Sequence, residues 1–86
     1  MPELCRFYGI IIRMYYADHN PAHFHAYYGD HGALVSIETF ALLSGRLPAR
    51  AQGLVAEWAA LRQQELRVAW MRAQNAEETG KIEPLP

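Results

Sequence analysis

Two kinds of periodicity divide the chain into an N-terminal and a C-terminal part. From about residue 4 to residue 38, apolar and polar positions alternate in short runs, as in strands that bury one face. From about residue 48 to residue 74, apolar positions recur every three or four residues, as in an amphipathic helix. The pattern predicts a single α+β domain over residues 1–86. It consists of a small antiparallel sheet of three to four strands at about 4–38, one long C-terminal helix at about 48–74 packed on one face, and an extended tail at 81–86.

The links between the expected strands are short, which favours an antiparallel meander. Tyr8-Gly9 and the run Gly-Asp-His-Gly at residues 29–32 have the residues of hairpin turns. A third turn falls at residues 17–22. Parallel neighbours would need much longer crossovers. Residues 39–45 either complete the fourth strand or form one loose helical turn.

Alternation within the strands assigns side chains to two faces of the sheet. The apolar face should carry Ile10, Ile12, Met14 and Tyr16, joined by Phe24, Ala26 and Tyr28. We expect the long helix to pack across it. The opposite face should carry Ile11, Arg13, Tyr15, His23, His25 and Tyr27.

Composition narrows the class of protein. A hydrophobic fraction of 51% is ample for a core in 86 residues, and a formal charge of −1 argues against charge-driven binding to nucleic acid. The lone cysteine, Cys5, excludes an internal disulfide framework and is typical of a reducing compartment. No export signal or membrane span is evident in the sequence, so we expect a cytoplasmic protein.

Three of the four histidines lie in the stretch Asp-His-Asn-Pro-Ala-His-Phe-His at residues 18–25. The Asn-Pro pair indicates a turn. The strand that follows places His23 and His25 on one face, and His19 lies close enough to fold back towards them. Imidazole titrates near neutral pH, so the three histidines are candidates for general acid and base in phosphodiester cleavage.

Two other interpretations of the histidines stay open. The set His19, His23 and His25 could bind a divalent metal such as zinc, whereas the catalytic interpretation needs no cofactor. Alternatively, the three imidazoles only cap the turn and hydrogen-bond its backbone.

The histidines share their predicted face with groups that suit RNA. Arg13 offers five donors for a phosphate, and the rings of Tyr15 and Tyr27 offer stacking surfaces that position unpaired bases. Only one long helix is available, so this face is either open or covered by a partner. Single-stranded RNA fits it better than duplex DNA. A protein interface and an ordinary sheet with aromatic cross-strand pairs are the alternatives.

A metal-independent cleavage scheme can be written with these residues. His25 or His23 accepts the proton of the 2′-hydroxyl group. The other of the two, or His19, protonates the leaving oxygen, and Arg13 stabilises the phosphorane-like charge.

The chain resembles a family of small bacterial proteins, the domain of unknown function numbered 4160 (DUF4160). The resemblance covers about residues 2–73. It rests on Arg-Phe-Tyr-Gly at residues 6–9, the histidine-rich stretch at residues 18–25, Gly29-Asp30, Glu57-Trp58 and Trp70. Many relatives have a second proline where this sequence has Ala22.

The resemblance implies a function and a partner. Members are commonly encoded beside a protein of the DUF2442 type, in an arrangement like a toxin–antitoxin pair. By analogy this chain is the toxin-like component, acting on RNA as a cleaving or binding growth inhibitor, and its neighbour is the antitoxin. The alternatives are a non-enzymatic module that docks a partner protein, or a metal-dependent hydrolase or sensor. Formation of a homodimer is a further option.

Overall fold

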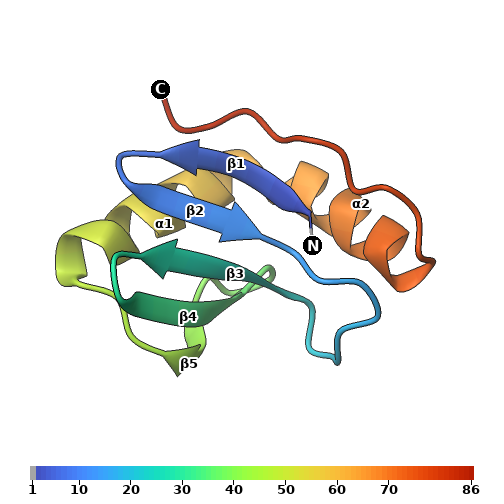
Figure 1. Cartoon of the computed structure of the whole chain (residues 1–86), viewed down its shortest axis with the longest axis horizontal. Helices are drawn as coiled ribbons and strands as arrows, with labels where there is room; N and C mark the ends of the chain where they lie inside the picture. Colours follow the sequence, from blue (N-terminus) through green and yellow to red (C-terminus); the bar gives the residue numbers. More distant parts are fainter. Residues whose placement is uncertain (1) are drawn as a thin grey trace.

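The computed structural model describes residues 2–86 as an antiparallel sheet with helices on one face (Figure 1). The five strands lie side by side in chain order. The elements are β1 Glu3–Phe7, β2 Ile10–Arg13, β3 His23–Tyr28, β4 His31–Ser36, β5 Leu42–Gly45, α1 Ala49–Leu61 and α2 Gln63–Gln74. The prediction of an α+β fold, with helical structure packed on one face of an antiparallel sheet, is confirmed. The expected three to four strands and single long helix are wrong in detail.

The fifth strand lies at the outer edge of β4, where the sequence left residues 39–45 unassigned. It pairs Leu34 with Ser44 and Ala33 with Gly45. The strand is short and largely exposed, so it carries no alternation of buried and exposed positions that a sequence pattern could reveal. Pairing with β4 creates it, rather than a local hydrophobic signal.

The long helix is broken at Arg62, between α1 and α2. The backbone of Arg62 leaves the helical region, with φ −115° and ψ 18°, while its N–H still bonds to carbonyl oxygens of Trp58 and Ala59. No proline or glycine lies at this position. Trp58 on α1 and Leu66 on α2 are both fully buried, and we attribute the bend to packing both segments on one twisted sheet. Neither helix within residues 2–86 is long and apolar enough to cross a membrane.

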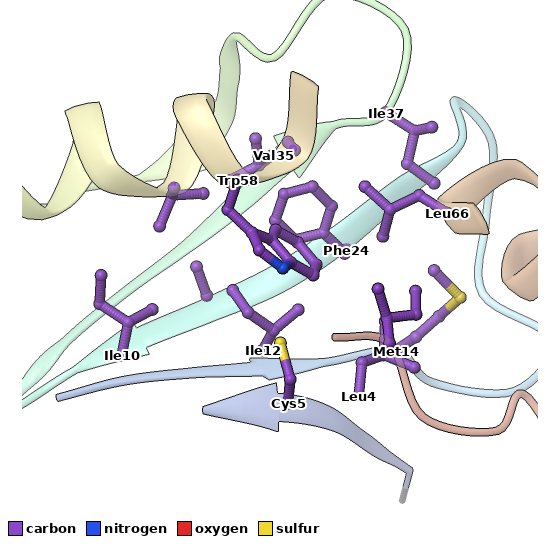
Figure 2. Close-up of a cluster of buried hydrophobic side chains, with 14 of the residues drawn as sticks. Leu4, Cys5, Ile10, Ile12, Met14, Phe24, Val35, Ile37, Trp58 and Leu66 are labelled. Carbon is purple, nitrogen blue, oxygen red and sulfur yellow. The ribbon is translucent and has the colours of Figure 1, made fainter. Parts of the chain in front are cut away.

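The core lies between the helices and the expected apolar face of the sheet (Figure 2). At its centre the rings of Trp58 and Phe24 meet edge to face, with centroids 5.6 Å apart. The fully buried neighbours include Leu4, Ile10, Ile12, Met14, Val35 and Ile37. Tyr16 and Tyr28, expected on this face, are exposed instead, because Tyr16 lies beyond the end of β2 and Tyr28 is the last residue of β3.

The tail at residues 81–86 has no helix or strand, and it runs along β1 (Figure 1). The backbone N–H of Ile82 donates to the Leu4 carbonyl oxygen at 3.1 Å, and Trp58 Nε1 donates to the Glu83 carbonyl oxygen at 2.8 Å. Ile82 and Leu85 are buried. The tail therefore closes one edge of the core.

Candidate functional site

The loop between β2 and β3 carries the first part of the histidine-rich stretch and is held by α2. The backbone N–H of Ala17 donates to the Ala73 carbonyl oxygen at 3.3 Å, and Gln74 Nε2 donates to the carbonyl oxygen of Asp18 at 3.0 Å. The Asn20–Pro21 peptide bond is cis. These contacts direct the Asp18 side chain back towards the start of β3.

Asp18, His23 and His25 form the central cluster of the candidate site. Asp18 Oδ2 lies 3.0 Å from His23 Nε2 and 3.1 Å from His25 Nε2. One ligand-type atom from each of the three side chains lies within 4.8 Å of the others. Both imidazoles therefore direct the same nitrogen to a single carboxylate oxygen.

The Asp18 carboxyl group is held in its ionised form. Partial burial opposes ionisation, but the hydrogen bond with His25, the backbone N–H of His19 and the proximity of His23 together lower the pKa of Asp18 below its usual range. The His19 N–H donates to Asp18 Oδ1 at 2.9 Å. The other carboxylate oxygen, Oδ2, is thus the one presented to the two imidazoles.

His23 is the buried member of the cluster, with 4% of its surface exposed. Its Nδ1 lies 2.8 Å from the carbonyl oxygen of Pro21, which fixes the ring to the turn. On one side the ring packs against Trp70 of α2, with centroids 5.2 Å apart, and on another against His25 at the same separation. Its orientation is therefore determined by both the turn and the helix.

His25 faces the side of the sheet that the helices leave open. Arg13 on β2 is its direct cross-strand neighbour, and the ring of Tyr15 meets the imidazole edge-on at 4.4 Å. Tyr27 stacks at a ring separation of 6.3 Å. The structure thus brings together the predicted arginine, both predicted tyrosines and one imidazole.

The two tyrosines are linked through their hydroxyl groups, which lie 2.8 Å apart. Burial, followed by the hydrogen bond with Tyr15, raises the pKa of Tyr27 to about 12. Tyr27 therefore stays neutral at physiological pH and acts as a hydrogen-bonding and stacking group. With Ile11 and Arg13, the two tyrosines line a shallow depression of about 310 Å³ on this face.

The guanidinium group of Arg13 is available to bind an anion. The carboxylate of Glu3, its cross-strand neighbour on β1, is bound by Arg6 at 2.7 Å. Among residues 2–86, no acidic side chain forms an ion pair with Arg13. Its guanidinium group can therefore bind an anionic ligand at the edge of the histidine cluster.

The side chain of His19 does not join the other two histidines, although the sequence predicts that it should. His19 is exposed, and the group that it contributes to the cluster is its backbone N–H. The third side chain of the cluster is that of Asp18, and not that of His19 as the sequence predicts. Trp70 of α2, which was not among the candidate site residues, also packs on His23. The only indication in the sequence that Asp18 belongs to the cluster is that it lies next to the three histidines. No rule of residue spacing predicts that a carboxylate in a loop contacts side chains of a strand.

Comparison with known proteins identifies a family that the chain matches. The model of a family described as a domain of unknown function (DUF4160) matches residues 9–71, which is more than half of the chain and includes the whole cluster. No curated protein and no solved structure matches.

Proposed function

The chain belongs to the DUF4160 family, and we propose that it is the toxin-like component of a bacterial toxin–antitoxin module that inhibits growth by acting on single-stranded RNA. One observation carries the proposal. On the face that the helices leave open, the unpaired Arg13 lies beside His25 and two tyrosine rings.

Each group on this face has a matching group on RNA. A guanidinium group binds phosphate through several donors. Exposed parts of aromatic rings stack on unpaired bases without regard to sequence, at about 1–3 kcal/mol per base. Tyr15 and Tyr27 are half-buried, so their rings are held rigidly and retain an accessible side. A phosphate at Arg13 would lie next to the Asp18–His23–His25 cluster, which we propose as the reaction centre.

The net charge of the chain limits the type of RNA binding. A formal charge of −1 provides no long-range attraction for a polyanion. Binding must therefore come from local contacts at the open face, and its dependence on salt should be weak. A slope of log affinity against log salt of about −0.7 to −1.4, as expected for one or two phosphate contacts on a single strand, would agree with this.

The metal-free cleavage scheme fits the structure only in part. His25 is accessible beside Arg13. His23 is buried, and both its ring nitrogens already face protein oxygen atoms, so it is poorly placed to exchange protons with a substrate.

An RNA-binding measurement tests the proposal directly. Fluorescence anisotropy with a labelled single-stranded RNA should show binding that weakens about tenfold in Arg13→Gln, since a charge-assisted hydrogen bond is worth about 1.5 kcal/mol. Arg50→Gln, an exposed arginine on α1, is the matched control. Equal affinities for the two variants would refute the assignment of this face to RNA.

A growth assay tests the cellular role. Induced expression without the antitoxin-like partner should arrest growth, and Arg13→Gln or His25→Ala should relieve the arrest. His31→Ala, at an exposed hairpin position, should not. The partner that we propose, of the DUF2442 type, would neutralise the protein by covering the open face.

A protein-docking module without enzymatic activity is the competing interpretation of the same face. Two results together would favour it. The partner protein would bind and Arg13→Gln would weaken that binding, while the chain would neither bind RNA nor arrest growth when expressed.

A further inference from the structure

The hydrogen-bonding pattern around His23 requires a positive charge at the centre of the cluster. The Pro21 carbonyl oxygen can only accept a hydrogen bond, so His23 Nδ1 must carry the hydrogen. In a neutral imidazole the other nitrogen then presents a lone pair. That nitrogen, Nε2, lies 3.0 Å from the Asp18 carboxylate, which is also an acceptor. Two lone pairs would face each other unless a proton or a metal ion lies between them.

The position of His25 is compatible with both solutions, and the metal ion accounts for it most simply. A second proton on His23 would satisfy Asp18 through one charge-assisted hydrogen bond. A neutral His25 could then add a second hydrogen bond, from its Nε2 to the same oxygen at 3.1 Å. A metal ion explains both imidazoles at once, because each nitrogen and the carboxylate oxygen would be its ligands.

We propose that Asp18, His23 and His25 bind one divalent transition-metal ion of the zinc class through Oδ2, Nε2 and Nε2. The distances agree with such a site. Ligand atoms around an ion with bonds of about 2.0–2.1 Å are separated by about 2.9–3.4 Å, and the two separations known here are 3.0 and 3.1 Å. Two imidazoles and one carboxylate are a donor set that zinc and ferrous iron accept.

The surroundings supply the second shell that metal ligands need. The Pro21 carbonyl oxygen holds His23 Nδ1, and the His19 backbone N–H holds the second oxygen of Asp18. Partners of this kind fix the tautomer and the orientation of the ligands. Trp70 and Tyr15 pack against the two imidazole rings, so that neither ring is free to rotate.

The site has room for a further ligand. Structural zinc sites are closed by four protein ligands, whereas catalytic sites have three and keep a position for water or substrate. The side chains of His25 and Asp18 are 16% and 24% exposed, so the cluster opens to solvent beside Arg13. Metal binding itself does not depend on the proposed action on RNA. Any action of the bound ion on an RNA phosphate does rest on that proposed function. In that case His23 and His25 would act as metal ligands and not as general acid and base.

The test is metal binding by the full chain, purified with a tag that contains no histidine. After removal of metal with a chelator, titration with Zn²⁺ should give about one equivalent per chain. Co²⁺ should produce visible ligand-field bands that Zn²⁺ abolishes. His25→Ala and Asp18→Asn should each lose at least about tenfold in affinity, with circular dichroism showing that both variants are folded.

Two controls make the ligand set specific. His19→Ala removes an imidazole from the same stretch, and His31→Ala removes one from an exposed hairpin. Both should bind Zn²⁺ as the unmodified chain does. Failure of the unmodified chain to bind, or full binding by His25→Ala and Asp18→Asn, would overturn the proposal in favour of a protonated His23. Loss of binding in His19→Ala would overturn this ligand set.

The outcomes separate this inference from the proposed function. RNA binding that depends on Arg13 but proceeds without any bound metal would leave the RNA proposal standing and remove the metal site. Stoichiometric zinc in a protein that neither binds RNA nor arrests growth would do the reverse.

Discussion

Truncating Phe24 tests the arrangement on which the site depends, because neighbouring residues of β3 point to opposite faces. Phe24 is fully buried, lies opposite Val35 on β4 and meets Trp58 edge to face. If Phe24 points to the helices, then His25 and Tyr27 must point to the open side of the sheet, whereas His23, at the start of the strand, also contacts Trp70 at the edge of α2. The Phe24→Ala variant therefore reports on the orientation of the whole strand.

The expected magnitude is large for a domain of this size. Replacing a buried phenylalanine with alanine costs about 3–5 kcal/mol, through lost burial and the cavity left behind. The contact with Trp58 contributes about 0.5–1.5 kcal/mol of this. A typical domain of this length has a free energy of unfolding of roughly 4–13 kcal/mol, so Phe24→Ala should lose a large share of the stability or unfold.

Urea denaturation followed by circular dichroism provides the measurement, with an unchanged m-value as the sign of intact two-state unfolding. Tyr27→Ala is the matched control, because it removes a half-buried ring from the other face of the same strand. It should cost about 1–3 kcal/mol, for the lost hydrogen bond with Tyr15 and the lost burial of about half a ring. If Phe24→Ala costs less than Tyr27→Ala, the strand presents its other face to the helices and the candidate site disappears with it.

Three further predictions follow from local features. Gly29 and Gly45 both have positive φ. A Cβ at Gly29 meets no neighbouring atom, whereas one at Gly45 would collide with the Gly32 carbonyl oxygen. Urea denaturation should therefore show that Gly29→Ala lowers the free energy of unfolding by about 1–2 kcal/mol and that Gly45→Ala lowers it clearly more. The pKa of Asp18 is lowered in the folded state, so its contribution to stability is present above the carboxyl's unfolded-state pKa and is lost as the pH falls through the folded value. Asp18→Asn should consequently reduce the acid dependence of the melting temperature below about pH 4, and an unchanged pH profile would contradict the ionised cluster. Burial raises the pKa of the Cys5 thiol to about 12, so a thiol reagent should label it at pH 8 only as fast as the protein opens; rapid labelling of the native chain would contradict its packing.

Several features of the fold and site were readable from the sequence because they depend on local periodicity. Alternation in β2 and β3 identified the apolar face, and the Tyr8-Gly9 and Gly29-Asp30 turns identified the hairpins. The same alternation placed His25, Arg13 and the tyrosines on the opposite face, where Arg13 pairs with His25 and the ring of Tyr15 contacts the imidazole.

Other features had no local signal. The edge strand β5 depends on pairing with β4, and the break at Arg62 depends on packing the two helical segments on one twisted sheet. The outward position of His19 follows from the path of its loop, because its backbone N–H is engaged by Asp18.

The sequence by itself determined which side of the sheet would be apolar and that the imidazole of His25 would lie beside Arg13 on the other side, since side chains along a strand alternate whatever lies around them. Only the tertiary structure decided that a carboxylate would complete the cluster. Asp18 lies in a loop, and its direction is fixed by contacts with α2, through Ala73 and Gln74. These residues are more than fifty positions away in the chain, so no local pattern encodes where the carboxylate points.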